Sequence, residues 1–282
     1  MISRVAVIGG GTMGNGIAHV LARQGLAVIL AEVDQGALER ARATIEKNLG
    51  REVSKGKLTA EAAGAALARI ATTTTLADAA AAELIIEAIP ERRELKSDLF
   101  RRLDALAASA TIFASNTSSL SITELAAVTR RPERCIGMHF MNPVPLMPLV
   151  ELIRGIATSD ATCATVRELA LRLDKQPVEV ADYPGFVSNR VLMPMINEAI
   201  FCVMEGVAEP AAVDAVMKMG MNHPMGPLTL ADFIGLDVCL DIMEVLYRGF
   251  NDSKYRPCPL LRRMVAAGWL GKKSGRGFFQ YS

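Results

Sequence analysis

The sequence has no excess of charge of either sign. Its 31 Lys and Arg residues stand against 30 Asp and Glu residues, which leaves a formal net charge of +1. A chain this close to neutrality has no long-range field that would attract a polyanion or an anionic membrane surface. We therefore expect neither nucleic acid nor a membrane as a partner, and a small molecule instead.

The sequence also has few cysteines, and its first residues lack the pattern of an export signal. The five cysteines are odd in number, widely spaced and flanked by apolar residues: Cys135, Cys163, Cys202, Cys239 and Cys258. This pattern favours buried free thiols in a reducing compartment over disulfides or a metal site. The residues after Met1 enter a strand pattern directly, without the charged leader and apolar stretch of an export signal. The sequence predicts a cytoplasmic protein without a metal.

Long uninterrupted apolar runs are absent too. The most apolar helical stretch, 184–207, is interrupted by Asn189, Arg190, Asn197 and Glu198. A membrane-spanning helix needs about 20 predominantly apolar residues. We therefore expect this stretch to be a core helix.

What the sequence does contain is an alternation of short apolar runs and longer amphipathic stretches up to residue 184. This alternation is typical of a parallel sheet with crossover helices. We predict an α/β, Rossmann-type, mostly parallel sheet over 1–184, with strands near 4–8, 27–32, 84–87, 111–115, 135–139, 149–153 and 176–180.

A second domain is predicted over 185–282. After Tyr183, Pro184 and Gly185 the strand signals stop, and apolar residues recur at helical spacing from Val187 and Val191 to Val203. The remaining segments are helical patterns separated by Gly and Pro. We expect an all-helical domain whose apolar stripe is partly covered by a second copy of the chain, in a homodimer.

A glycine-rich turn follows the first predicted strand. Gly9, Gly11 and Gly14 give the GxGxxG spacing, with Thr12 and Met13 at the start of a helical pattern. In such a turn the first glycine permits the tight bend, the second removes a Cβ that would meet a pyrophosphate, and the third lets the helix approach the sheet. The helix N-terminus then binds the phosphates. The alternative is a glycine-rich turn without a ligand.

Glu32, at the end of the second predicted strand, indicates which nucleotide binds. Its carboxylate can accept hydrogen bonds from the ribose hydroxyls and would repel a 2′-phosphate. Val33 and Asp34 follow it, so no adjacent arginine offsets that repulsion. We predict NAD over NADP; the alternative is that Glu32 is a solvated residue at a strand end.

Polar residues lie on or just after three further predicted strands, and we place them at the edge where open α/β sheets bind ligands. A loop from Asn116 to Ser119 comes after one strand, His139 lies at the end of the next, and Glu151 lies on the third. Oxidation of a secondary alcohol needs a base, and histidine serves in both directions near neutral pH. Glu151 could fix its tautomer. A purely structural histidine and an ordinary polar turn are the alternatives.

At this point the sequence resembles the L-3-hydroxyacyl-CoA dehydrogenase family, and it is similar in size to its short bacterial 3-hydroxybutyryl-CoA dehydrogenases. The resemblance covers essentially the whole chain. It is carried by GGGTMG at 9–14, EAIPE at 87–91, SNTSSL at 115–120, HFMNPVPLMPLVE at 139–151, PGFVSNR at 184–190 and GKKSGRGFF at 271–279.

The resemblance implies roles for particular residues. His139 matches the family's catalytic base, Glu151 its partner, and Ser118 the serine that hydrogen-bonds the substrate oxygen. Asn189 matches an asparagine that helps to bind the substrate and the nicotinamide. Ala88, Glu91, Lys96 and Asn116 are then cofactor contacts, together with Ser118 and His139; Glu91 and Lys96 are expected on the rim.

The resemblance also implies an activity, the NAD-dependent interconversion of a short 3-hydroxyacyl-CoA, such as 3-hydroxybutyryl-CoA, and its 3-oxo form. Lys55 and Lys57 are candidates for the CoA phosphates, although a solvated helix tip would look the same. Two other functions stay open: a dehydrogenase of a free hydroxy acid or sugar acid on this fold, and a non-catalytic NAD-binding protein.

Overall fold

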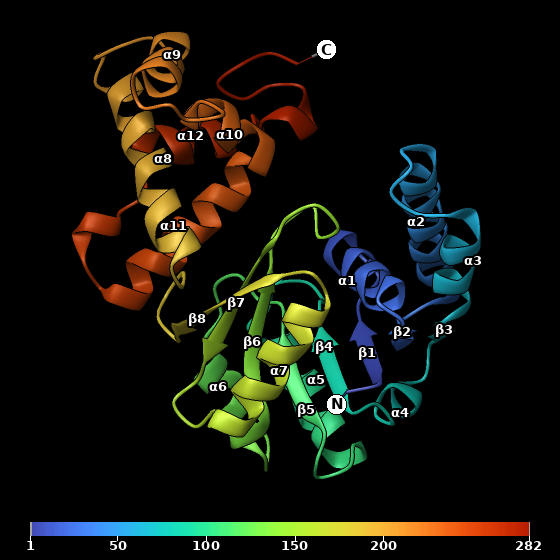
Figure 1. Cartoon of the computed structure of the whole chain (residues 1–282). Coiled ribbons are helices and arrows are strands. Elements are labelled where there is room, and N and C mark those ends of the chain that lie inside the picture. Colours follow the sequence, from blue (N-terminus) through green and yellow to red (C-terminus); the bar gives the residue numbers. More distant parts are fainter. Residues whose placement is uncertain (1, 282) are drawn as a thin grey trace. The chain divides into compact units, whose positions relative to one another are not determined.

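One sheet organises residues 1–182 of the computed structural model, which describes residues 2–281 (Figure 1). The strand order is β3-β2-β1-β4-β5-β6-β7-β8. The strands are β1 (Arg4–Ile8), β2 (Ala27–Ala31), β3 (Ile70–Thr73), β4 (Leu84–Glu87), β5 (Ile112–Ser115), β6 (Cys135–Phe140), β7 (Leu149–Arg154) and β8 (Gln176–Ala181). All neighbouring strands are parallel except β6 and β7, which are antiparallel.

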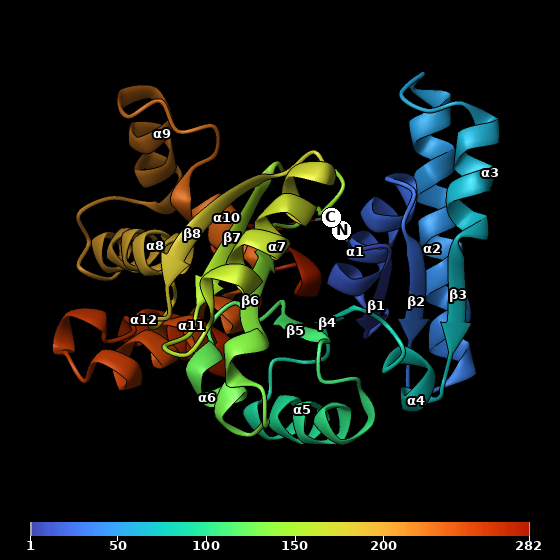
Figure 2. The ribbon, with the colours of Figure 1, turned by 60° about the horizontal axis from the view of Figure 1, so that its bottom comes forward.

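Helices connect the strands. In this unit they are α1 (Thr12–Arg23), α2 (Gln35–Ser54), α3 (Ala60–Ala68), α4 (Leu76–Ala79), α5 (Arg93–Leu106), α6 (Ile122–Ala127) and α7 (Asp160–Arg172), with one 3₁₀ turn (Pro132–Arg134). Figure 2 shows α2 and α3 side by side next to β2 and β3. The strand order reverses beside β1, and at such a point the loops diverge and leave room for a ligand.

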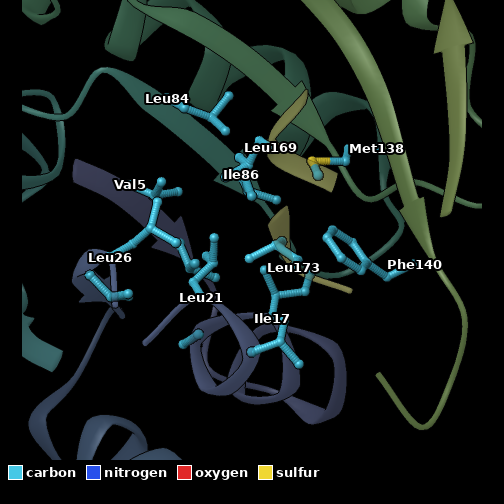
Figure 3. Packing of buried hydrophobic residues seen from close by; sticks show 14 of the residues in the cluster. Val5, Ile17, Leu21, Leu26, Leu84, Ile86, Met138, Phe140, Leu169 and Leu173 are labelled. Atoms are coloured by element: carbon cyan, nitrogen blue, oxygen red, sulfur yellow. The ribbon is translucent and has the colours of Figure 1, made fainter. Parts of the chain in front are cut away.

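Alternate side chains of each strand enter different cores, because successive residues point to opposite faces of a sheet. On β1, Val5 and Val7 belong to the core shared with α1, α2 and α7, while Ala6 and Ile8 belong to the core shared with α4, α5 and α6. Figure 3 shows the first of these cores, where Leu21 of α1 packs near Val5. Helices therefore cover both faces of the sheet.

The predicted fold class is confirmed, and each of the seven predicted strands is present to within one residue at either end. The eighth strand, β3, was not predicted. It lies at the edge of the sheet, and only Ile70 among its four residues is buried. An edge strand with exposed Ala71 and Thr72 has no continuous apolar run that would reveal it.

Residues 183–282 form a second unit. Its helices are α8 (Ser188–Met204), α9 (Pro210–Gly220), α10 (Pro227–Ile234), α11 (Leu236–Phe250) and α12 (Pro259–Ala266), with 3₁₀ turns at Ser253–Tyr255 and Lys272–Ser274. Ile196 and Ile200 of α8 pack in one core with Leu236 and Met243 of α11. Val191, predicted on the apolar face of α8, is instead 67% exposed.

Within residues 2–281, no helix combines the length and the apolar character needed to cross a bilayer. The five cysteines are free thiols; four are buried, and Cys202 is partly exposed.

Candidate active site

The glycine turn joins β1 to α1, and its three glycines each meet a different spatial requirement. Gly9 has φ +100°, and a Cβ there would lie 2.5 Å from the Ala88 carbonyl oxygen. A Cβ on Gly14 would lie 1.7 Å from the Gly9 carbonyl oxygen, whereas a Cβ on Gly11 would meet nothing within 4 Å. Gly9 and Gly14 therefore allow close packing of the backbone, whereas Gly11 faces open space.

That open space suits a phosphate group. Gly11 is the N-cap of α1, and no side chain caps the helix. The N–H groups of the first turn, which includes Thr12 and Met13, and the positive end of the helix dipole therefore favour an anion at the turn.

Glu32, at the end of β2, is held in place from two sides. Its Oε1 accepts a hydrogen bond from the Gly10 N–H at 2.6 Å, and its Oε2 accepts one from the Val33 N–H at 2.9 Å. Each oxygen keeps a further lone pair that can accept from a hydroxyl group. The carboxylate is thus oriented before any nucleotide arrives.

A pocket of about 490 Å³ adjoins the turn. It is lined by residues from the glycine turn, α1, α2 and the loop after β6, among them Gly10, Gly11, Thr12, Glu32, Arg40 and Asn142. Arg40 and Asn142 were not predicted as site residues. Arg40 is eight positions beyond Glu32, and only the placement of α2 against the turn brings the two residues to one pocket.

A buried lysine links two carboxylates at the end of β4. The Lys96 Nζ donates to Glu87 Oε1 at 2.6 Å and lies 3.1 Å from Glu91 Oε2. Lys96 and Glu87 are buried, so Lys96 lies beneath the rim on which it was expected. Burial raises the pKa of Glu87, an effect that Lys96 and Ser115 oppose. Glu87 is a supporting residue that motif reading did not single out.

Glu91 organises the loop after β5. Its Oε1 accepts from Thr117 Oγ1 at 2.5 Å, from the Ser118 N–H at 2.9 Å and from the Ser119 N–H at 3.2 Å. Burial alone would raise the pKa of Glu91, but Lys96 and these donors outweigh it, and the pKa is lowered. Glu91 therefore stays ionised and fixes the backbone that carries Ser118.

Asn116 connects this loop to the next strand. Its Oδ1 accepts a hydrogen bond from the Phe140 N–H at 2.9 Å. Because Phe140 follows His139 on β6, this bond holds the serine loop next to the strand that carries the histidine.

His139 and Glu151 form a cross-strand pair. They are Cα partners in the antiparallel register of β6 and β7, and His139 Nδ1 lies 2.8 Å from Glu151 Oε2. Both side chains are buried. Residues directly opposite on antiparallel strands have neighbouring side chains, which explains how two residues twelve positions apart meet.

Three predicted residues belong to other elements. Lys55 and Lys57 are exposed in the connection between α2 and α3, and Asn189 is in the first turn of α8, which belongs to the second unit. Ala88 lies against Gly9 and donates its N–H to the Ile8 carbonyl oxygen at 2.7 Å. Among residues 2–281 no cluster of His, Cys, Asp or Glu could hold a metal ion.

Comparison with known proteins identifies the family. The description of the NAD-binding domain of 3-hydroxyacyl-CoA dehydrogenases matches residues 4–183, and that of their C-terminal domain matches residues 185–281. The chain belongs to the 3-hydroxyacyl-CoA dehydrogenase family. The resemblance predicted from the motifs is thereby confirmed, and so are NAD as the cofactor and the class of enzyme, an NAD-dependent dehydrogenase.

Individual members of this dehydrogenase family match along their whole length. A probable 3-hydroxybutyryl-CoA dehydrogenase of Bacillus subtilis is 58% identical over 280 residues, which cover 99% of this chain and 98% of the relative. The 3-hydroxybutyryl-CoA dehydrogenase of Bradyrhizobium diazoefficiens is 56% identical over 281 residues, covering 100% and 96%. A crystal structure of (S)-3-hydroxybutyryl-CoA dehydrogenase from Ralstonia eutropha has a TM-score of 0.98 at 51% identity and covers 100% of both chains.

Asp182 is a further residue of this region that sequence reasoning missed. Its carboxylate accepts from Ser121 Oγ at 2.8 Å, from the Ile122 N–H at 3.1 Å and from the Thr123 N–H at 2.7 Å. It thus caps α6, the helix that follows the serine loop. The only signal was an acidic residue in a turn, and its partners lie about sixty positions away in the sequence.

Proposed function

We propose that the protein interconverts a short-chain 3-hydroxyacyl-CoA, 3-hydroxybutyryl-CoA above all, and the 3-oxoacyl-CoA. The observation that carries the proposal is the 2.8 Å contact between His139 Nδ1 and Glu151 Oε2, on the same sheet as the glycine turn. The names of relatives that are 50% to 58% identical support the same substrate.

In the proposed mechanism His139 is the proton acceptor. Its Nδ1–H donates to Glu151, which leaves Nε2 to take the proton of the substrate 3-hydroxyl as the O–H bond breaks. The Glu151 carboxylate then stabilises the imidazolium. When bound, NAD supplies the nicotinamide ring that accepts the hydride from C3. In the reverse direction His139 returns the proton to the oxygen.

The other predicted residues act on binding in this proposal. Ser118 Oγ hydrogen-bonds the substrate oxygen, and Asn189 is a further substrate-binding residue. Lys55 and Lys57 are proposed to meet the CoA phosphates, as exposed cations on flexible side chains can. Glu32 is proposed to bind the adenosine ribose of NAD and to reject NADP.

A side-by-side assay tests the substrate. NADH absorbance is followed with acetoacetyl-CoA for reduction, and with 3-hydroxybutyryl-CoA and free 3-hydroxy acids for oxidation. We expect kcat/KM for the CoA ester to exceed that for the free acid by at least about a hundredfold, because the CoA contacts contribute binding energy. Equal rates on the free acids would overturn the CoA assignment, and no turnover of either would favour a non-catalytic NAD-binding protein.

We further propose that the protein is a cytoplasmic homodimer. Apolar side chains are exposed on α8 and α9 or just after α9, among them Val191, Val216, Met219 and Met221. A second copy of the chain would remove these side chains from water. Sedimentation equilibrium tests the oligomeric state, because a monomer mass at micromolar concentration would contradict the homodimer.

A further inference from the structure

Lys175 immediately precedes β8, in the turn after α7, and is almost completely buried, with a relative exposure of 4%. Its Nζ donates to the Val144 carbonyl oxygen at 2.6 Å and to the Met147 carbonyl oxygen at 2.8 Å. Both acceptors belong to the loop at 141–148, which joins β6 to β7. A buried ammonium group is costly unless it is hydrogen-bonded. If this side chain only filled space, methionine would stabilise the fold more than lysine, because burying methionine does not desolvate a charge.

The charges around Lys175 do not explain its position. Burial lowers its pKa, the nearby charge of Arg23 lowers it further, and Asp174 raises it. What the side chain does have is a pair of well-placed carbonyl acceptors. Its contribution is therefore to hold the backbone of the loop.

The same loop is fixed at other points. The N–H of Gln176, the residue next to Lys175, donates to the Pro148 carbonyl oxygen at 2.7 Å. On the other side a Cβ on Gly16 of α1 would lie 2.9 Å from Val144 Cβ, so the helix packs directly against the loop. The loop is thus confined between α1 and the residues that lead into β8.

This confined loop forms a wall of the nucleotide pocket. Asn142, Pro143, Val144 and Pro145 line the pocket together with Gly10, Gly11 and Glu32. The loop also separates His139 from Glu151 in the sequence, so its shape affects both the pocket and the strand pair.

We propose that Lys175 is a positioning residue for ligand binding: by holding the carbonyl groups of Val144 and Met147, it sets the distance between the loop wall and the glycine turn. It touches no substrate and acts through the backbone of the loop. The proposal deepens the proposed function, since it concerns the pocket that the nucleotide uses.

The test compares Lys175→Met with a control that is destabilised without touching the loop. Methionine keeps the length and apolar part of the side chain but cannot donate to the two carbonyls. Leu103→Ala is the control, because Leu103 of α5 is buried in the core on the other face of the sheet, which contains no residue of the loop. NADH binding is titrated by fluorescence, KM and kcat are measured with acetoacetyl-CoA, and hydrogen exchange is followed at the amides of 144–147.

We expect Lys175→Met to raise the Kd of NADH and the KM of acetoacetyl-CoA by about tenfold, with kcat at saturation within about threefold of wild type. Exchange at Val144, Leu146 and Met147 should accelerate in this variant and not in Leu103→Ala. A purely structural role would give both variants the same Kd and the same exchange pattern at equal melting temperature, and that result would overturn the proposal.

Lys175→Arg covers the case in which the methionine variant does not fold. A guanidinium group keeps donors for both carbonyls in a different geometry, so we expect a smaller rise in Kd, of about threefold. Faster exchange at Val144, Leu146 and Met147 in this variant, with an unchanged Kd of NADH, would contradict the inference, because the loop would then not control binding. The NADH titration contains no acyl-CoA, so its outcome is independent of whether the substrate assignment is correct.

Discussion

The half of the sheet proposed to bind the cofactor and the half proposed to carry the reaction are built by different chemical means. Around β1 and β2 the site consists of glycines, which have no side chain, and of backbone N–H groups. Glu32 is the acidic residue there, and hydrogen bonds fix its orientation. Around β5, β6 and β7 it consists of paired side chains, above all His139 and Glu151. Backbone amides cannot change protonation at neutral pH, whereas an imidazole can. Changes in the first half should therefore alter nucleotide binding, and changes in the second should alter turnover.

Replacement of His139 by Gln gives the largest expected effect and tests the reaction half. Glutamine keeps a polar side chain of similar reach but cannot take up a proton. We expect kcat to fall by roughly 10²- to 10⁴-fold while the Kd of NADH stays within about threefold of wild type. Steady-state kinetics and NADH fluorescence measure the two quantities separately.

Glu151→Gln is the matched variant for that measurement. It retains an oxygen that can accept from His139 Nδ1 but removes the charge that stabilises the imidazolium, so we expect a smaller loss of kcat, of about ten- to a hundredfold. A loss of less than about tenfold in His139→Gln would point to another base, and a parallel loss of NADH binding would break the division between the two halves.

Glu32→Ala tests the cofactor half with a smaller effect. Removal of the carboxylate takes away both the ribose acceptor and the repulsion of a 2′-phosphate. We expect the preference for NAD over NADP, measured as the ratio of kcat/KM values, to fall by about tenfold, with kcat at saturating NAD nearly unchanged. An unchanged preference would remove Glu32 from cofactor selection.

The two halves also differ in how much of them the sequence could predict. The glycine turn is a local motif, and its spacing alone indicated Gly9, Gly11 and Gly14 correctly as positions of close packing or open space. The pair of His139 and Glu151 was harder to predict, because a separation of twelve residues does not show that β6 and β7 are antiparallel neighbours. The residue types suggested the pair, the resemblance to a family gave each residue a role, and the register explains how the two meet.

Supporting residues were the least predictable part. Glu87, Asp182 and Lys175 act through partners that lie up to about sixty positions away, and their types are common in turns and strand ends. Burial is the property that marks Glu87 and Lys175, and burial depends on the packing of elements that the sequence does not order in space. β3 was missed for the related reason that an edge strand exposes half of its side chains.

Glu91 contacts both Lys96 and the serine loop, so it belongs to neither half alone. Its replacement has the smallest expected effect of these variants. The pKa of Glu91 is lowered in the folded protein, so its ionised form stabilises the fold. That stabilisation is fully present above the pKa of the unfolded state and is lost as pH falls through the pKa of the folded state. Glu91→Gln cannot titrate, so its melting temperature should lie below that of wild type by about 3 °C at neutral pH and approach it in acid.

Differential scanning fluorimetry from about pH 7 down to about pH 3 measures this convergence, which begins only below the ordinary pKa range of a glutamate, with Glu94→Gln on the exposed face of α5 as the control. The serine loop should loosen together with the stability, since five donors of Thr117, Ser118 and Ser119 converge on one oxygen of Glu91. We therefore expect kcat to fall by about threefold while NADH binding also weakens slightly. A loss confined to kcat would assign Glu91 to the reaction half, and a loss confined to NADH binding would assign it to the cofactor half.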